Sequence, residues 1–192
     1  MRVSNFTVIY DANVLYPNFL RDVLLRLAVT DLFRARWTED IHQEWMRSVL
    51  RDRPELESKI LRTRELMDSH VKDAIVTGYQ DLIGGLQLPD PNDRHVLAAA
   101  IKSHAQLIIT WNHQDFPAEA LEPYGVRTQN PDDFIIDLLE LDAATVFLAI
   151  ERHRTGLKCP PFAPDDYIAA LQRQRLTKAS TVLRTLWHPH SS

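Results

Sequence analysis

Glycine is scarce in this chain of 192 residues, which contains only 5 glycines. A sequence this poor in glycine argues against long flexible linkers and against a glycine-rich loop that cradles phosphate groups. Cysteine is scarcer still, since Cys159 is the single cysteine. Because one thiol cannot form a disulfide within the chain, we expect the protein to work in a reducing compartment.

Long apolar runs are missing as well. No stretch of the sequence approaches the roughly 20 apolar residues that cross a bilayer. Polar residues, among them Asp11, interrupt the apolar stretch near the N-terminus, so it does not read as a secretory signal. We therefore expect a cytoplasmic protein with no membrane partner.

An excess of positive charge is also absent, because the formal net charge is -4. The charge is nevertheless uneven along the chain. From Asp142 onward there are seven Lys and Arg against four Asp and Glu, which gives +3 there and -7 in the rest. This asymmetry fits a basic contact surface beside an acidic site, and it fits an ordinary solvated helical surface equally well.

Short apolar runs alternate with helical patterns through about residue 140. Buried strands are expected at 6–11 (FTVIYD) and 105–110 (AQLIIT), with a weaker strand at 33–37 (FRARW). From about residue 143 onward only helices are expected. The alternation predicts an α/β fold with a parallel sheet flanked by helices, followed by a C-terminal helical extension. We place the two parts at 1–141 and 142–192.

Four acidic residues from separate segments are expected to meet at one edge of this sheet. In open parallel sheets, the carboxyl ends of the strands and the helix N-termini that follow them lie along the same edge. Asp11 ends the first strand, Asp115 follows the AQLIIT strand, and Glu44 flanks the apolar stripe of a helix. Taken singly, the two aspartates also fit turn positions, and Glu44 also fits a salt bridge to an arginine.

The fourth acid lies in the stretch LPDPNDRHVLAAAIKSH, which holds both Asp90 and Asp93. Asp90, directly before a proline, is typical of a helix N-cap. At about 100° per residue, Asp93 lies about 20° from Ala100 on the helix face that should be buried. We therefore expect Asp93 to point toward the sheet edge and His95 to point away from it.

Acidic side chains that converge in this way need a counter-charge. Carboxylates brought together repel one another unless protons or a cation neutralise them. Carboxylate oxygens suit Mg²⁺ or Mn²⁺, and no Cys/His spacing indicates zinc. Such a site typically serves metal-assisted phosphoryl chemistry, in which the metal activates a water molecule and neutralises the phosphate charge.

Four segments, VIYDANVLYPN, TEDIHQEW, LPDPNDRHVLAAAI and IITWNHQDF, resemble in order and spacing the motifs of PIN-domain ribonucleases. That family includes the VapC toxins of bacterial toxin–antitoxin pairs. The resemblance covers about residues 6–137, and the helical tail resembles an extension that one subgroup of these toxins carries. It implies a PIN-like three-layer fold, with 1–141 as the nuclease domain and 142–192 as the extension.

The same resemblance implies an activity and partners. The activity is that of a Mg²⁺- or Mn²⁺-dependent endoribonuclease, the toxin of its pair, which leaves 5′-phosphate and 3′-hydroxyl ends. The partners are an RNA substrate, a cognate antitoxin protein that blocks the acidic pocket, and a second copy of the chain in a homodimer.

Matched position by position, the resemblance implies that Asp11, Glu44 and Asp93 are catalytic residues that bind the metal. Asn13 matches a polar position that orients the site. Asp90 is then a helix cap or a group outside the direct ligands.

The fourth motif departs from the family pattern. Asn112 stands where many members have an acid, and the nearest acid is Asp115. We assign Asp115 as the fourth catalytic and metal-binding acid, either directly or through water, with Asn112 as the alternative source of that contact.

Basic side chains near these motifs are candidates for holding the RNA backbone. These candidates are Arg47, Arg94, Lys102 and His113. The basic tail has three open roles, since it can bind RNA, cover the core or contact the antitoxin.

Two other functions compete with the ribonuclease on the sequence. A PIN-like module that only binds RNA or protein needs no metal, yet the three principal acids are all present. An aspartate-nucleophile phosphatase would attack through Asp11 and would need a second acid two residues later as general acid. Asn13 stands at that position, which counts against the phosphatase.

Overall fold

A four-stranded parallel sheet forms the centre of the protein in the computed structural model, which describes residues 6–159 and 161–188. The strand order is β2-β1-β3-β4, and each neighbouring pair runs parallel. The strands are β1 (Thr7–Tyr10), β2 (Arg34–Arg36), β3 (Leu107–Ile109) and β4 (Arg127–Gln129). Residues 1–5 and 189–192, the outer ends of the two predicted parts, lie outside the described residues.

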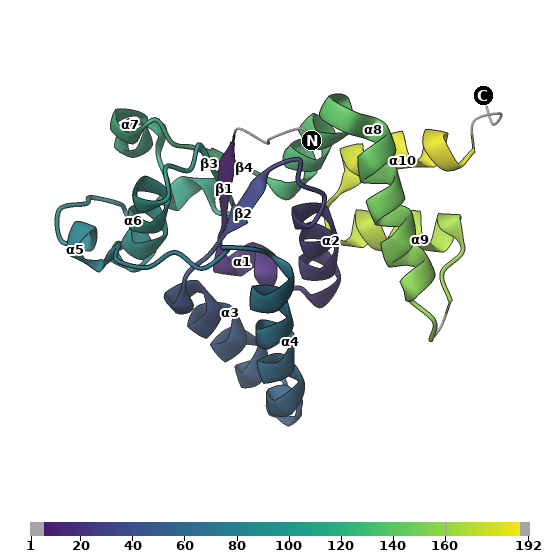
Figure 1. Ribbon diagram of the computed structural model, residues 1–192, viewed down its shortest axis with the longest axis horizontal. Coiled ribbons are helices and arrows are strands. Elements are labelled where there is room, and N and C mark those ends of the chain that lie inside the picture. Colours follow the sequence, from purple (N-terminus) through teal and green to yellow (C-terminus); the bar gives the residue numbers. More distant parts are fainter. Residues whose placement is uncertain (1–5, 160, 189–192) are drawn as a thin grey trace.

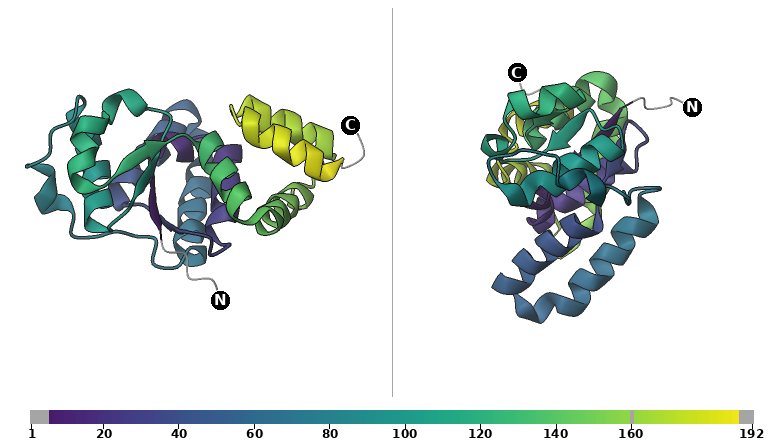
Figure 2. Two further views of the ribbon diagram at one scale, coloured as in Figure 1. Left: turned by 90° about the horizontal axis from the view of Figure 1, so that it is seen from above. Right: turned by 90° about the vertical axis from the view of Figure 1, so that its left-hand side faces the viewer.

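Helices cover both faces of this sheet (Figure 1). In the described part they are α1 (Ala12–Leu15), α2 (Asn18–Ala28), α3 (Glu39–Asp52), α4 (Glu57–His70), α5 (Gln80–Ile83), α6 (Arg94–Lys102), α7 (Ala118–Leu121), α8 (Pro131–Gly156), α9 (Pro164–Arg173) and α10 (Thr177–Trp187). Helix α6 packs on β1 and β3 from one side, and α2 packs with α8 on the other side, as the view from above in Figure 2 makes clear. The α/β fold class with a C-terminal helical region is therefore confirmed.

The central strands form where the sequence is most apolar. All residues of β1 are buried, and Ile108 and Ile109 of β3 are fully buried between the helical layers. Strand β4 was not predicted, because its sequence RTQ is polar and it lies at the edge of the sheet. Its backbone pairing with β3, and not its side chains, makes it a strand.

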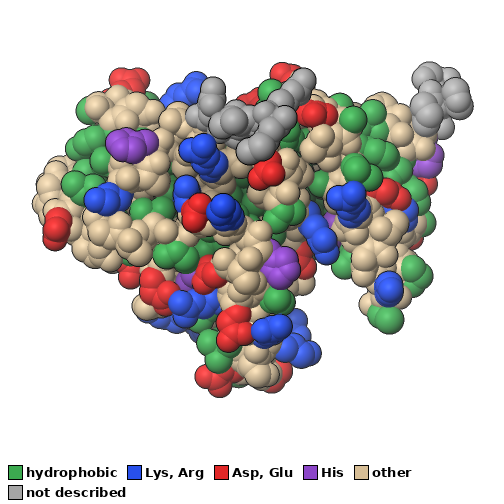
Figure 3. Space-filling model, in the orientation of Figure 1, with side chains coloured by type: hydrophobic (Ala, Val, Ile, Leu, Met, Phe, Trp, Pro, Cys, Tyr) green, Lys and Arg blue, Asp and Glu red, His purple; other side chains and the backbone are tan. Residues whose placement is uncertain are grey.

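Helices α3 and α4 form a pair that projects from the rest of the molecule (Figure 1). Thr38 caps α3 by accepting a hydrogen bond from the backbone N–H of Ile41 at 3.1 Å, as its type and position predict. Lys and Arg side chains are interspersed with Asp and Glu on the projecting pair (Figure 3). The pair therefore presents a mixed-charge surface on this face.

The C-terminal helices pack on one another, and α8 connects them to the rest of the fold by packing against α2. Helix α8 runs from Pro131 to Gly156 but departs from helical geometry at Asp142 (φ -157°, ψ 83°), where we predicted the second part to begin. Helix α10 contacts both α8 and α9. None of the helices in the described part is long and apolar enough to cross a membrane.

Candidate active site

Asp11 follows β1 directly and is the N-cap of α1. Its carboxylate accepts hydrogen bonds from the backbone N–H of Ala12 (2.6 Å), the side-chain amide of Asn13 (2.6 Å) and the hydroxyl of Thr110 (2.7 Å). The residue is only 5% exposed, so these donors hold a buried carboxylate in one orientation. Asn13, expected to orient the site, does contact Asp11.

Glu44 projects from α3 toward α6, where its Oε2 lies 3.3 Å from Nε2 of His95. The His95 side chain is 12% exposed, so it is turned inward. The sequence prediction that His95 points away from the site is therefore wrong, because a single-helix wheel cannot include a neighbouring helix. Among the described residues, the ion-pair partner of Glu44 is this histidine and not an arginine.

Asp90 and Asp93 flank the turn that begins α6. Asp90 is the N-cap of a 3-10 turn, Pro91–Asp93, and accepts a hydrogen bond from the backbone N–H of Asn92 at 2.8 Å, in agreement with its predicted cap role. Asp93 ends that turn. Its Oδ2 atom is buried and has no hydrogen-bond partner among the described residues. An unpartnered buried carboxylate oxygen is costly, which makes it a candidate ligand atom.

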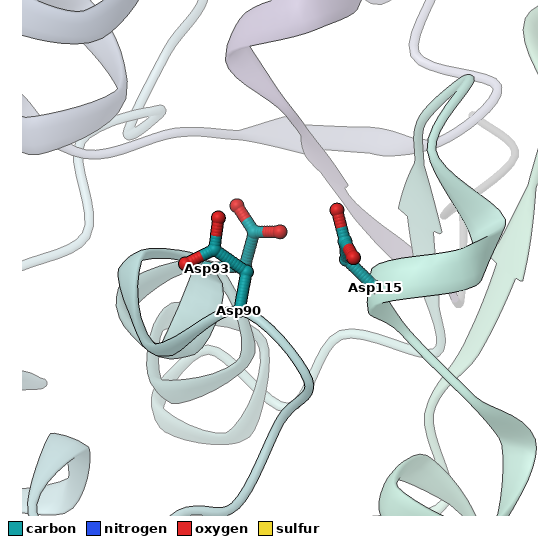
Figure 4. Close-up of side chains that lie close together, drawn as sticks. All are labelled: Asp90, Asp93 and Asp115. Atoms are coloured by element: carbon teal, nitrogen blue, oxygen red, sulfur yellow. The ribbon is translucent and has the colours of Figure 1, made fainter.

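Asp115 approaches the same place from the turn after β3. Oxygen atoms of Asp90, Asp93 and Asp115, one from each, all lie within 4.8 Å of one another. Figure 4 shows Asp90 and Asp93 projecting from the start of α6, with Asp115 across from them. The side-chain amide of Asn112 donates a hydrogen bond to Asp115, so both alternatives for the fourth position lie at the site.

An open cavity of about 370 Å³ connects these groups. Its walls include Asp11, Asn13, Glu44, Asp93 and Asn112, which come from four segments far apart in the sequence. Asp93 belongs both to this cavity and to the group with Asp90 and Asp115. The structure thus brings the three principal acids of the sequence prediction and Asp115 to one edge of the sheet.

Crowding and burial both disfavour the ionised forms of Asp11 and Asp93. Burial raises the pKa of Asp11 to about 6, and the charge of Glu44 adds to the increase. Burial also raises the pKa of Asp93 to about 7, with further contributions from Asp11, Asp90, Asp115 and Glu44. Additional positive charge beside these two carboxylates would therefore favour their ionised forms.

His95 supplies part of that positive charge. Burial lowers the pKa of His95, but its hydrogen bond to Glu44 and the charges of Glu44, Asp40 and Asp11 outweigh this effect, so that the pKa is raised overall. A protonated His95 would balance one carboxylate of this group.

The residues present fit a divalent cation. The unpartnered Oδ2 of Asp93 is a hard oxygen donor in a crowded group of carboxylates. Oxygen donors of this kind are the ligands that Mg²⁺ and Mn²⁺ prefer. Asp11, Glu44, Asp93 and Asp115 are the residues placed to hold such an ion.

Comparison with known proteins identifies the family of the chain. The family model described as "PIN domain" matches residues 7–114, which is more than half of the chain and includes Asp11, Glu44 and Asp93. The chain belongs to the PIN-domain family.

A second family model, "VapC50 C-terminal domain", matches residues 131–185, which begin at α8. A protein of Mycobacterium tuberculosis named "Putative ribonuclease VapC50" is 39% identical over 101 residues, 53% of this chain and 59% of that protein. The matched part thus spans little more than half of the relative. No solved structure matches the chain significantly.

The predicted RNA-binding residues of this PIN domain lie at different distances from its acids. Arg47 is exposed on α3, and Arg94 begins α6 immediately after Asp93. His113 is exposed and bonds the hydroxyl of Thr128 through Nδ1 at 3.0 Å. Lys102 ends α6, about 12 Å along the helix axis from its start. The structure therefore does not bring Lys102 to the acidic cavity.

The PIN-domain cavity also includes residues that the sequence reasoning missed. Tyr16, Ser48 and Arg51 line it, and the hydroxyl of Tyr16 donates to Asp52 at 2.6 Å. Ser48 and Arg51 are four and seven residues after Glu44, which places all three on one face of α3. This helical spacing from Glu44 is the sequence signal from which Ser48 and Arg51 could have been predicted to lie at the site.

Proposed function

We propose that this protein is a Mg²⁺- or Mn²⁺-dependent endoribonuclease and the toxin of a toxin–antitoxin pair. The observation that carries the proposal is the meeting of Asp11, Glu44, Asp93 and Asp115 at one sheet edge, with a buried oxygen of Asp93 left unpartnered. Membership of the PIN-domain family and the ribonuclease name of the relative support the same reading.

Each side chain has a role that its contacts suggest. Asp11 and Asp93 are the central ligands, because Asp11 is buried, Asp93 is half-buried, and the raised pKa of each means that it would release a proton when a cation is bound. Asn13 and Thr110 hold Asp11, and Asn112 holds Asp115. The bound ion supplies the activated water and neutralises the charge of the scissile phosphodiester.

His95 is a positioning residue in this proposal. Its ring fixes the carboxylate of Glu44, and its raised pKa favours the protonated form beside that carboxylate. Arg51, on the cavity wall, is placed to meet the phosphate backbone of the RNA.

The two-part organisation belongs to this proposal as well. We take 1–141 as the nuclease domain and 142–192 as the extension, supported by the departure from helical geometry at Asp142. The VapC50 similarity supports a cytoplasmic toxin with a cognate antitoxin, and a homodimer is the expected assembly.

The aspartyl phosphatase is less well supported. Its general acid would stand at the position of Asn13, whose amide donates to both Asp11 and Thr110. An amide fixed in this way offers no titratable proton to a leaving group.

RNA cleavage in Mn²⁺, with and without EDTA, tests the proposal. Wild type is compared with Asp11→Ala, Asp93→Ala and a control, Glu140→Gln, at an exposed position on α8. We expect cleavage by wild type and the control only, lost in EDTA, with 5′-phosphate and 3′-hydroxyl products. Cleavage that persists in EDTA or in both alanine variants contradicts the metal site, and 2′,3′-cyclic phosphate ends contradict attack by water.

A protein that binds RNA or antitoxin without cutting RNA gives a different result. Wild type, Asp11→Ala and Asp93→Ala would then all fail to cleave, and all would be equally harmless when expressed. If wild type inhibits growth and the two alanine variants do not, this result supports the proposed function as a toxin.

A further inference from the structure

One side chain of the C-terminal extension lies against the segment that follows β3. The guanidinium carbon of Arg175, in the turn between α9 and α10, lies 4.3 Å from the centre of the Trp111 ring. Trp111 follows β3 by two residues and is only partly buried, while Arg175 is exposed. A residue of the extension and a residue of the PIN domain therefore form one exposed aromatic–cation pair.

Trp111 is fixed at the cavity wall by its backbone. Its N–H donates to the side-chain oxygen of Asn13 at 3.1 Å, and Asn13 lines the cavity. Its neighbours in the chain are Thr110, which bonds Asp11, and Asn112, which also lines the cavity. The backbone of Trp111 therefore lies at the wall of the cavity where we propose that RNA is cut, and its partly buried ring lies on the adjoining surface under the guanidinium of Arg175.

Arg175 is held in place by the packing of α10. The carboxylate of Asp132, near the start of α8, accepts the backbone N–H groups of Lys178 and Ala179, both at 2.9 Å. Because α8 follows β4 and β4 pairs with β3, these bonds anchor the α9–α10 turn at the carboxyl edge of the sheet. The position of Arg175 over the ring is therefore built into the fold.

The backbone of Arg175 adopts a conformation that is unusual for arginine. Its φ is 64°, in the left-handed region where glycine is the usual residue after a helix. No salt bridge joins Arg175 to an acid in the described part of the chain. An arginine that occupies a position usual for glycine and lies over an aromatic ring, with no acid paired to it in the described residues, has the features of a nucleic-acid contact.

We propose that Trp111 and Arg175 form a subsite for a nucleotide of single-stranded RNA next to the scissile phosphate. The base stacks on the Trp111–Arg175 pair, and the guanidinium contacts the adjacent phosphate. The extension is then part of the substrate-binding surface and selects single-stranded RNA. The inference rests on the proposed ribonuclease function and adds to it an RNA-binding role for the extension and two residues that carry it.

RNA binding measured separately from cleavage tests the subsite. A fluorescein-labelled oligoribonucleotide is titrated with Asp93→Asn protein, which leaves the RNA uncut, and fluorescence anisotropy gives Kd at several salt concentrations. Arg175→Gly is added to this background, since glycine suits the positive φ and the turn is retained. Arg173→Ala, at an exposed arginine two residues earlier, is the matched control.

We expect Arg175→Gly to raise Kd about 5- to 50-fold and to reduce the slope of log Kd against log salt by about 0.7. Trp111→Ala should raise Kd without that change in slope, and Trp111→Phe should keep most of the affinity. Arg173→Ala should change Kd less than about twofold.

Two failures are distinguishable. If wild type cleaves RNA and Arg175→Gly binds it with unchanged Kd and salt slope, the subsite is refuted and the pair only packs the extension on the core. If wild type neither cleaves nor binds RNA, the proposed function fails and the subsite fails with it.

Discussion

Replacing Asp93 by Asn should stabilise the metal-free protein near pH 8 while abolishing RNA cleavage. The charge on Asp93 is unfavourable in the absence of metal, because its carboxylate is partly buried beside Asp11, Asp90, Asp115 and Glu44. An amide has nearly the same size and carries no charge. The substitution therefore removes the repulsion and, with it, a proposed ligand.

The magnitude follows from the pKa. The pKa of Asp93 rises from 3.8 to about 7. That is about three units, and at about 1.4 kcal/mol per unit the unscreened effect is about 4 kcal/mol. Because the side chain is only half-buried, solvent screening reduces this to about 1–2 kcal/mol. A domain of this size gains about 2–4 °C in Tm per kcal/mol, so the variant should melt about 2–8 °C higher.

The pH dependence has a definite sign. The folded-state pKa of Asp93 lies above its unfolded value, so the stability from its bound proton is full below about pH 4 and is lost as the pH rises through about 7. The difference between variant and wild type should therefore be near zero at pH 4 and full at pH 8. Thermal denaturation in EDTA at pH 4, 6 and 8 measures it.

A matched control is Asp166→Asn, in the first turn of α9, where the acid is exposed. It should leave Tm unchanged or slightly lower at every pH. Our reasoning is refuted if Asp93→Asn melts below wild type at pH 8, or if its shift is the same at pH 4 and pH 8.

Three further substitutions test other contacts. Asn13→Ala removes an amide that holds Asp11, so Mn²⁺ affinity by calorimetry should fall about 10- to 100-fold; unchanged affinity would contradict an orienting role. Asp68→Ala leaves the buried His42 ring without its 2.9 Å partner, which should lower the free energy of unfolding by about 1–3 kcal/mol in urea; a loss under about 0.5 kcal/mol argues against this link between α3 and α4. Asp132→Ala should speed hydrogen exchange in α10 more than in α2, and uniform exchange would show that Asp132 does not anchor α10.

The sequence predicted the strands whose formation depends on burial. FTVIYD and AQLIIT are apolar runs, and β1 and β3 form there with their side chains in the core. Strand β4 was missed because its stability comes from backbone hydrogen bonds to β3, which a polar sequence does not reveal. Cap residues such as Thr38 and Asp90 were predicted because a cap is a local interaction.

The candidate site was predictable only in part, for the same reason. Asp11 and Asp93 follow from topology, since strand ends and helix starts share one edge of a parallel sheet. The predicted direction of the His95 side chain was wrong, because its partner Glu44 is about fifty residues distant in the chain and lies on another helix. The contact of Arg175 with Trp111 depends on how the extension folds back, which no local pattern specifies.

The central claim is that one acidic site both binds the metal and cuts RNA. The most direct test measures Mn²⁺ binding by calorimetry and Mn²⁺-dependent RNA cleavage on the same preparation, for wild type and Asp93→Asn. We predict that the Mn²⁺ concentration for half-maximal cleavage matches the Kd for Mn²⁺, and that Asp93→Asn loses both. Cleavage in EDTA, or a variant that binds Mn²⁺ and cleaves RNA as wild type does, would contradict the claim.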